Sequence, residues 1–518
     1  MKCFFLSVVL LFCNSITAQT TTFNKRIRVG CANTVLRGLE VTDSCYYVVG
    51  IARDTINCNP STCFLKIDTL GNTNFYTIYE NATPSPFFSP LVTTWDQNLM
   101  TLYYHPDQST GSWVGGLLKF DEQGNGTPFT QIFNPNTTGH PIVPSDLKIM
   151  PDSGFIVTNY IADSIHSNTD IGIIRLDKYG NQQWYTTRGF PLYHEYGTRI
   201  YLDSDNLFTI GYHQDNLYIT SSSYTMRSVI EGIDGMGNTQ WIYQSPHNAL
   251  LYGVGDFIQT KDNGWVVSSG LATEQINTGG AANSVNIEAY IYKLDSSRNF
   301  LWSKKFHANT GIRANFGKIL ELDDSSLVAF GSVINTYQQP NSYNIIHGLM
   351  VKLSPQGDSL WSRSYEYLTT QNAQHIIYDV ECTADSGYLL CGHATSGAVG
   401  IENQQGWLLK LDEHGCLVPN CHIIPNSTNP IKKPIVDVLL YPNPAIDYLN
   451  IHYRNPRLGN ELTFQVTDIS GRVLNSYTTS DISDKTYIVP VYDLIKGIYI
   501  IEVLQDKEIV YVEQFVKT

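Results

Sequence analysis

The chain has 518 residues, of which 42% are hydrophobic, 12% aromatic and only 15% charged, a composition typical of a large folded protein and not of a disordered one. Its 33 lysines and arginines stand against 47 aspartates and glutamates, for a formal net charge of −14. No basic run appears, which disfavours a nucleic-acid partner, because binding to a phosphate backbone depends on clustered cations.

Residues 1–18 predict a signal peptide, because an apolar run, FFLSVVLLF, is followed by an Ala-Gln junction. Cys13 would be the lipidated residue of a lipoprotein, but no small residue precedes it, so cleavage after Ala18 is favoured. No later stretch approaches the roughly 20 apolar residues that a transmembrane helix needs. We therefore expect an exported chain without a transmembrane segment.

A segment of similar sequence then recurs seven times, for example as FLKIDTLGNTNF from Phe64 and IIRLDKYGNQQW from Ile173. Its anchor positions follow one another at intervals of 53 to 61 residues and are Asp68, Asp121, Asp177, Asp234, Asp295, Ser354 and Asp412. Each line reads as a strand, a tight turn and a second strand. Five of the turns contain a glycine suited to positive φ, namely Gly71, Gly124, Gly180, Gly237 and Gly357.

An aromatic residue follows the anchor in most units, and we expect it to pack against the neighbouring unit. It lies seven positions after the anchor in five units, at Phe75, Trp184, Trp241, Trp302 and Trp361. In the second unit Phe129 lies eight positions after Asp121, which predicts a one-residue bulge.

A second turn-and-strand line precedes each of these lines, so that each unit holds four strands. Four antiparallel strands repeated seven times predict an all-β fold, a seven-bladed β-propeller spanning residues 19–421. The last unit has no convincing fourth strand, whereas the segment FNKRIRVG from Phe23 resembles the fourth strands elsewhere. We therefore expect the ring to close by pairing of this segment with the strand at Trp407, which removes an exposed edge.

Eight cysteines remain after signal-peptide cleavage, an even number that suits disulfides outside the cytoplasm. Two pairs are each five residues apart, and local pairing is their simplest interpretation: Cys58 with Cys63, and Cys416 with Cys421. Four more lie in the first and last units, where a bridge would staple the ring, but their connectivity stays open: Cys31, Cys45, Cys382 and Cys391. Neither a C-x-x-C pair nor an H-x-x-x-H motif occurs, so we expect no metal site, and no motif indicates a cofactor.

The repeat stops before residues 422–436, a linker containing PNSTNPIKK, and residues 437–518 form short alternating strands typical of a small immunoglobulin-like β-sandwich. This last part resembles the type A C-terminal sorting domain of the type IX secretion system of Gram-negative bacteria. The residues that carry the resemblance are Tyr441, Pro442, Asn443, Pro444, Asp447, Asp468, Ser470, Gly471, Arg472, Leu494, Gly497, Tyr499 and Phe515–Lys517.

The resemblance implies that the C-terminal domain is an address for export and carries no catalytic residue. Its partner would be the type IX secretion machinery. The cargo would pass through the periplasm and the outer membrane and be released or held at the cell surface.

The propeller itself shows no strong catalytic motif. Its longest and most variable links, between second and third strands, are rich in Gly, Ser, Asn and Tyr, and such loops on a rigid frame are where recognition is usual. The candidate ligand-binding residues are His213, Tyr218, Tyr224, His307, Tyr337 and Tyr343. We expect a binding or adhesion module for an extracellular protein or glycan. The alternatives are a polysaccharide lyase or glycosidase, with paired carboxylates or a His and a Tyr at the channel mouth, and a structural spacer.

Overall fold

The structure is a computed structural model. It describes residues 21–518 apart from 32, 54–58, 80–82, 85–89, 107–112, 133–141, 164–167, 191–192, 204–206, 217–225, 247–250, 277–283, 307–313, 338–342, 397–403, 419–420, 422–436, 455–460, 469–471, 482–484 and 507. Tyr218, Tyr224, His307, Cys58 and Gly471 lie outside the described residues, as do residues 1–18.

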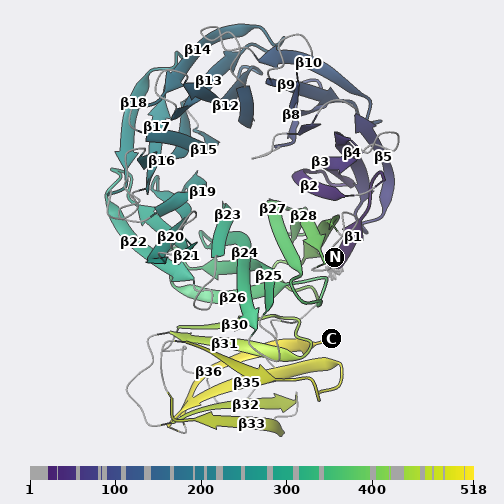
Figure 1. Ribbon diagram of the computed structural model, residues 1–518, viewed down its shortest axis with the longest axis vertical. Helices are drawn as coiled ribbons and strands as arrows, with labels where there is room; N and C mark the ends of the chain where they lie inside the picture. Colours follow the sequence, from purple (N-terminus) through teal and green to yellow (C-terminus); the bar gives the residue numbers. More distant parts are fainter. Residues whose placement is uncertain are drawn as a thin grey trace, which may run out of the picture.

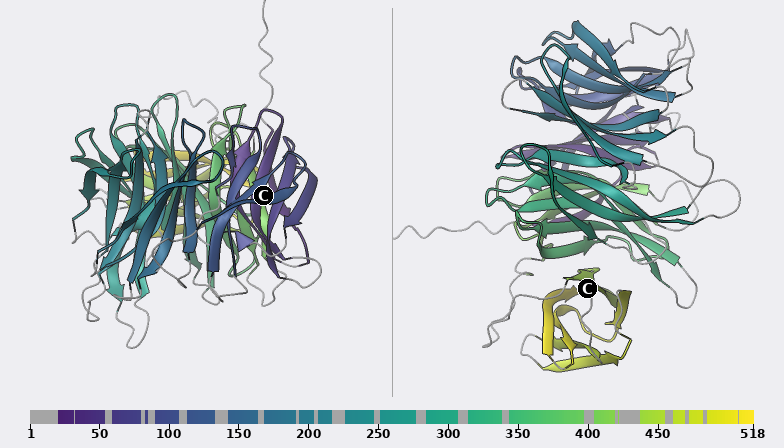
Figure 2. Two further views of the ribbon diagram at one scale, coloured as in Figure 1. Left: turned by 90° about the horizontal axis from the view of Figure 1, so that it is seen from above. Right: turned by 90° about the vertical axis from the view of Figure 1, so that its left-hand side faces the viewer.

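The described residues form strands joined by turns and links, and the predicted all-β propeller is confirmed. Seven groups of strands surround a central axis, with the first strand of each group facing the centre and the fourth on the outside (Figure 1). Seen edge-on, the ends of the blade strands lie at the two faces of the ring (Figure 2).

The first three blades hold strands β2 to β14, each blade an antiparallel sheet. Blade one consists of β2 (Thr34–Val41), β3 (Cys45–Arg53), β4 (Pro60–Asp68) and β5 (Thr73–Tyr79). Blade two consists of β6 (Thr83–Pro84), β7 (Val92–Thr93), β8 (Leu99–Pro106), β9 (Trp113–Phe120) and β10 (Gly126–Ile132). Blade three consists of β11 (Ile142–Ile149), β12 (Phe155–Asp163), β13 (Asn168–Leu176) and β14 (Gln182–Arg188).

The next three blades repeat this order. Blade four consists of β15 (Tyr193–Leu202), β16 (Phe208–Asn216), β17 (Met226–Ile233) and β18 (Thr239–Gln244). Blade five consists of β19 (Leu251–Gln259), β20 (Trp265–Ile276), β21 (Ser284–Leu294) and β22 (Phe300–Phe306). Blade six consists of β23 (Ala314–Glu321), β24 (Leu327–Tyr337), β25 (Tyr343–Leu353) and β26 (Ser359–Tyr365).

The last blade joins the two ends of the propeller chain. Its strands are β27 (Gln374–Cys382), β28 (Tyr388–Thr395), β29 (Gln404–Leu411) and β1 (Phe23–Ile27). β1 pairs antiparallel with β29, with Arg26 opposite Trp407. One parallel pairing, Ile346 with Gln374, also links blades six and seven.

The tight turns at the anchor positions are built by the aspartate itself. The Oδ1 atom of Asp177 accepts hydrogen bonds from the backbone N–H groups of Tyr179 and Asn181, each at 2.8 Å. Gly180 has φ +87°, and all five predicted turn glycines have positive φ. The turn is therefore specified locally, by an acceptor side chain and a residue free to adopt the left-handed conformation.

The outer aromatic residues join neighbouring blades, as predicted. A Cβ atom placed on Gly357 in blade six would lie 2.8 Å from the indole of Trp302 in blade five. In blade one, Gly71 lies in the same way under Phe23 of β1. The fifth unit has Arg298 at this turn position, and its guanidinium lies 4.7 Å from the ring centre of Trp241. The predicted bulge in blade two is confirmed, because the β9–β10 register shifts between Pro128 and Thr130.

One predicted disulfide is confirmed and one is wrong. Cys416 and Cys421 are bonded. Cys63 is a free and fully buried thiol, so its predicted pairing with Cys58 was wrong. Cys63 lies within β4, where strand alternation points its side chain into the core with Leu65 and Ile67. Burial raises the pKa of this thiol to about 12.

No disulfide links the cysteines of the first blade to Cys382 or Cys391 of the last blade. Cys31 is disulfide-bonded, but Cys45, Cys382 and Cys391 are free thiols. In the described residues the ring is therefore closed by strand pairing and by side-chain packing.

The C-terminal residues fold as two sheets packed face to face. One sheet has the order β30-β31-β34 and the other β33-β32-β35-β36, and one hydrophobic core lies between them. The strands are β30 (Asp437–Tyr441), β31 (Tyr448–Arg454), β32 (Leu462–Asp468), β33 (Val473–Thr479), β34 (Lys485–Pro490), β35 (Gly497–Gln505) and β36 (Glu508–Lys517).

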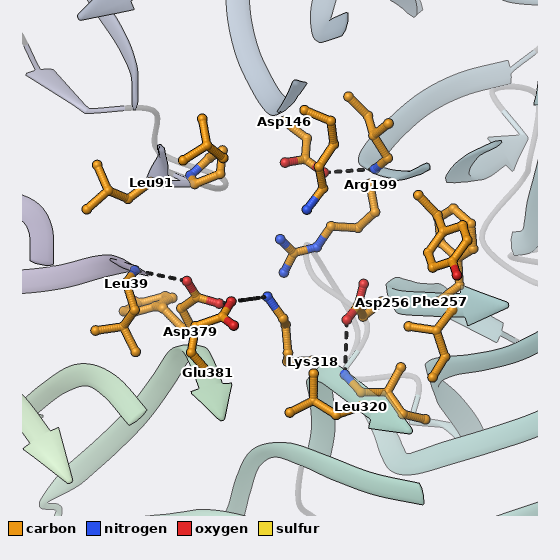
Figure 3. A pocket seen from close by; sticks show the side chains of 18 of the residues that line it. Leu39, Leu91, Asp146, Arg199, Asp256, Phe257, Lys318, Leu320, Asp379 and Glu381 are labelled. Carbon is orange, nitrogen blue, oxygen red and sulfur yellow. Dashed lines mark hydrogen bonds and ion pairs between the residues drawn. The ribbon is translucent and has the colours of Figure 1, made fainter. Parts of the chain in front are cut away.

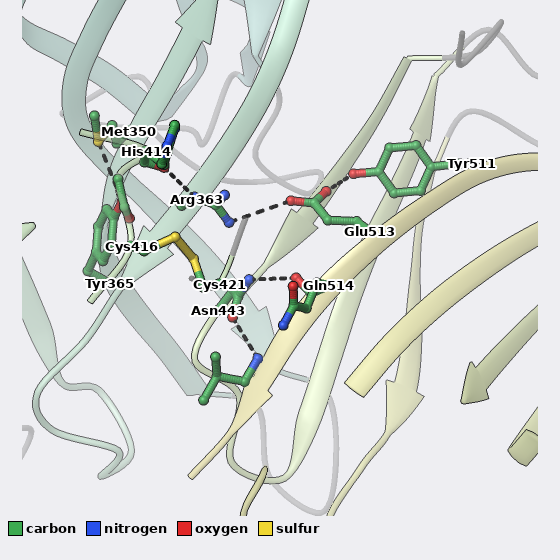
Figure 4. Close-up of polar contacts among 12 residues, drawn as sticks. Met350, Arg363, Tyr365, His414, Cys416, Cys421, Asn443, Tyr511, Glu513 and Gln514 are labelled. Carbon is green, nitrogen blue, oxygen red and sulfur yellow. Dashed lines mark hydrogen bonds and ion pairs between the residues drawn. A yellow bond between two sulfur atoms is a disulfide. The ribbon is translucent and has the colours of Figure 1, made fainter. Parts of the chain in front are cut away.

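This sandwich contacts the outer edge of the propeller, where β30 lies against β26. Figure 4 shows the contact: Arg363 of β26 lies 3.9 Å from Glu513 of β36, and its Nε donates to the carbonyl of His414. Val516 packs against the Cys416–Cys421 disulfide. Burial raises the pKa of Glu513 to about 7, although Arg363 opposes this shift.

Candidate functional site

The central channel holds two cavities, and the inner strands line both. On β2, Val35 and Arg37 line one cavity, and Arg37 and Leu39 line the other. Tyr378 of β27 also lines both. The cavities therefore lie at successive levels of the channel.

The mouth cavity, of about 400 Å³, lies where the second strands end and the third strands begin. Its polar and aromatic lining consists of Asn33, Arg37, Arg53, Tyr104, Tyr378 and Gln404. The lining is completed by Val35, Ile51 and Pro60. Among the described residues that line this cavity there is no carboxylate. The guanidinium of Arg37 lies 4.1 Å from the ring centre of Tyr378, a cation–π contact.

Both tyrosines of the mouth cavity are neutral phenols. Burial raises the pKa of Tyr104 and of Tyr378, and in each case Arg37 partly opposes the shift. The mouth cavity therefore offers positive guanidinium groups, aromatic surfaces and neutral donors and acceptors.

The lower cavity, of about 240 Å³, is lined by charged residues at one level of successive inner strands (Figure 3). We call these residues the charge ring: Asp146, Arg199, Asp256, Lys318 and Asp379. Acidic and basic residues alternate from blade three to blade seven. Each follows a register irregularity in its strand, a β-bulge that re-aims the side chain.

The three aspartates of the charge ring hold neighbouring blades together. Each uses its Oδ2 atom to accept a backbone N–H from the inner strand of the next blade, at 2.8 to 3.0 Å. The pairs are Asp146 with Ile200, Asp256 with Ile319 and Asp379 with Leu39. The last pair ties blade seven to blade one. Each donor lies on the innermost strand of its blade, which pairs on one side only, so these hydrogen bonds satisfy N–H groups at the open edge of that strand.

The two cations of the charge ring also have partners. Arg199 donates to the carbonyls of Gly255 and Gly317, at 3.1 and 2.9 Å. Lys318 Nζ lies 3.0 Å from Asp379 and 3.5 Å from Glu381. Burial alone would lower the pKa of Lys318, but these carboxylates raise it above its usual range, and the amine stays charged.

Burial raises the pKa of two carboxyls at this level. Asp256 is shifted upward by burial, against the opposing charges of Arg199 and Lys318. Glu381 is shifted upward by burial, against Lys318. Both carboxyls lie next to cations and have oxygens that accept hydrogen bonds.

Of the candidate residues from sequence, Tyr218, Tyr224 and His307 lie outside the described residues, and the described lining of the two cavities does not include His213. His213 lies in β16, partly buried, and burial lowers its pKa to about 3. Tyr337 and Tyr343 pair as the last backbone partners of the β24–β25 hairpin. The described channel residues were missed. Their signal was a charged residue that recurs at a similar position in the first strands of five units.

Sorting-motif residues hold the last strand of the sandwich. Asn443 donates from Nδ2 to the Gln514 carbonyl at 3.0 Å and accepts the Val516 N–H on Oδ1 at 2.9 Å. Tyr441 is buried, and Tyr499 stacks on Phe515 and donates to the Ile495 carbonyl. The peptide bonds before Pro442 and Pro444 are cis.

The chain has similarities of fold among solved structures. Drosophila Semaphorin 2a is 8% identical, with a TM-score of 0.40, and the match covers 96% of this chain and 98% of that one. The β-propeller domain of the trilobed protease from Pyrococcus furiosus is 8% identical, with a TM-score of 0.40 and coverages of 74% and 96%.

The α-L-arabinofuranosidase Arb93A from Fusarium graminearum, in complex with an iminosugar inhibitor, is 9% identical, with a TM-score of 0.40 and coverages of 64% and 92%. At such identities the likeness concerns the fold and not the activity. No curated protein matches the chain.

The C-terminal part matches a family. Residues 439–518 match the secretion system C-terminal sorting domain, which confirms the resemblance carried by the motif residues. Within the described residues no helix has the length and apolar character to cross a membrane. The chain therefore carries a C-terminal sorting domain and is exported by a type IX secretion system to the cell surface or the extracellular space.

Proposed function

We propose that the exported propeller is a binding module that takes an extracellular glycan carrying anionic groups at its mouth cavity. The observation that carries this proposal is the lining of that cavity: Arg37 and Arg53, with no carboxylate among its described residues, in a chain of net charge −14. A local excess of positive charge in an acidic protein favours an anionic ligand.

The other lining groups suit a sugar. An arginine presents a fork of N–H donors that matches a carboxylate or a sulfate. The rings of Tyr104 and Tyr378 provide flat apolar surfaces for the C–H face of a pyranose, and the amides of Asn33 and Gln404 can both donate and accept. The cavity lies where second strands end and third strands begin, the strand ends that the variable links of the sequence join.

A protein ligand is the competing binding hypothesis, and a polysaccharide lyase or glycosidase is the competing enzyme hypothesis. Turnover of a glycan needs an acid or a base within reach of the sugar. The described lining of the mouth cavity supplies no carboxylate, and the aspartates of the charge ring are engaged with backbone amides. Burial raises the pKa of Tyr104 and of Tyr378, which makes these phenols poor candidates for the base of a lyase. This arrangement favours binding over turnover.

The test is a glycan array with the mature chain, residues 19–518, together with a polysaccharide-degradation screen. We expect binding to uronate-containing or sulfated glycans, weakened about tenfold by Arg53→Ala. Arg472→Ala is the matched control, because that side chain is 75% exposed on the sorting domain, and it should leave binding unchanged. Release of reducing ends or unsaturated products would establish an enzyme instead. Absence of glycan binding would reject the proposal and direct the search to protein partners.

A further inference from the structure

The lower cavity differs from the mouth cavity in its balance of charge. Four cations line it, Arg37, Lys148, Arg199 and Lys318, and four acids, Asp146, Asp256, Asp379 and Glu381. The lining is therefore formally neutral, in contrast to the basic mouth cavity and to the acidic chain as a whole. Donors and acceptors are also interleaved, because the charge ring alternates from blade to blade (Figure 3).

Most of these charged groups are already engaged within the protein. Asp146 and Asp379 each accept backbone N–H groups on both oxygens. Arg199 is held by two carbonyls. These bonds fix the ring in one arrangement before any ligand arrives, and a fixed arrangement of this kind favours specific binding.

Two charged side chains of the lower cavity can still bind a ligand. Lys148, two residues beyond Asp146 on β11, lines the cavity, and within the described chain no hydrogen bond or ion pair holds its amine. Glu381, two residues beyond Asp379 on β27, has a side chain that is 41% exposed and reaches Lys318 only at 3.5 Å. A strong donor and a strong acceptor therefore face the same cavity from different blades.

We propose that the lower cavity is a second binding site, for a small neutral polyhydroxyl compound such as a monosaccharide or a polyol. A hydroxyl group donates to a carboxylate and accepts from an ammonium or guanidinium at once, so adjacent hydroxyls satisfy an alternating ring of charges. A ligand with a net charge would leave the formally neutral cavity with an unbalanced charge, which is costly away from water. Leu39, Leu91 and Leu320 supply apolar wall for the C–H groups of such a ligand.

Arg37 and Tyr378 line both cavities, but the two proposed sites are separable by mutation. Lys148 lines only the lower cavity, and Arg53 lines only the mouth cavity. Lys148→Met keeps the aliphatic stem and removes the charge, and it breaks no described hydrogen bond. The variant should therefore fold as the wild type does, which its thermal unfolding would verify.

The experiment is isothermal titration of the mature chain with neutral hexoses, pentoses and inositol, and with glucuronate and glucosamine as charged probes. We expect a neutral compound to bind and Lys148→Met to weaken it at least tenfold, with Glu381→Gln acting in the same direction. Arg53→Ala should leave this affinity unchanged within twofold. Failure of every neutral probe, binding of the charged probes alone, or equal affinity in wild type and Lys148→Met would each overturn the inference. If the glycan array shows no binding but the titration still detects binding of a neutral compound, only the glycan site proposed for the mouth cavity is rejected.

Discussion

The contact between a turn glycine and the aromatic residue of the preceding blade predicts a large effect of Gly357→Ala. Gly357 has φ +83°, a conformation that costs an L-residue about 1 to 2 kcal/mol. A Cβ atom there would lie 2.8 Å from Trp302 Cδ2 and Cε3, well inside the usual contact distance of about 3.5 Å. The indole must therefore move, and moving a packed ring adds roughly 1 to 3 kcal/mol.

We expect Gly357→Ala to lower the free energy of unfolding by about 2 to 5 kcal/mol, measured by urea denaturation followed by tryptophan fluorescence. Gly317→Ala is the matched control in the same blade, because nothing lies within 4 Å of the added Cβ and its φ is not positive. That variant should be neutral or slightly stabilising. Equal unfolding midpoints for Gly357→Ala and the wild type, or an equal loss in the control, would refute the packing argument.

Three further predictions concern hydrogen bonds and titration. Asp379→Asn should lower the free energy of unfolding by on the order of 3 kcal/mol, because it leaves a lysine and a backbone amide poorly paired. The control Asp323→Asn, at an exposed ion pair, should change the free energy of unfolding in urea by less than about 0.5 kcal/mol. Similar losses in the two variants would count against the inter-blade hydrogen bond. Asn443→Ala should speed hydrogen exchange of the Val516 amide, which the asparagine carbonyl holds; unchanged protection would exclude this role. Burial lowers the pKa of His375 to about 3, against about 6.5 when unfolded. Its contribution to stability is therefore complete above about pH 6.5 and is lost as the pH falls toward 3, and His375→Gln should flatten this dependence in unfolding measured from pH 7 to 4.

The architecture could be predicted from sequence because its determinants are local. Asp177, Asn181 and the intervening glycine specify one turn by contacts within five residues. The same Asp–Asn contacts recur in the four units anchored at Asp68, Asp121, Asp234 and Asp295. The sorting domain was recognised for a related reason. Asn443 has a fixed structural task, the hold on the last strand, so its motif is short and specific.

The cysteine prediction failed because spacing alone says nothing about which way a strand side chain points. The interval from Cys58 to Cys63 suits a small loop, but β4 begins at Pro60 and carries Cys63 into the core. Cys416 and Cys421 have the same spacing and do pair. The difference is that Cys416 follows the end of β29, where the chain turns.

The charge ring shows why the channel could not be located from the sequence. Alternation along a strand predicts that Asp146 and Lys148 share a side, but it cannot say whether that side is the channel or a blade interface. The bulge before each ring position shifts the alternation by one residue. In addition, Asp379 reaches Leu39 only because β1 closes the ring and brings blade seven beside blade one. The charges therefore acquire their partners from closure, and a cavity that depends on closure has no signature in any single repeat.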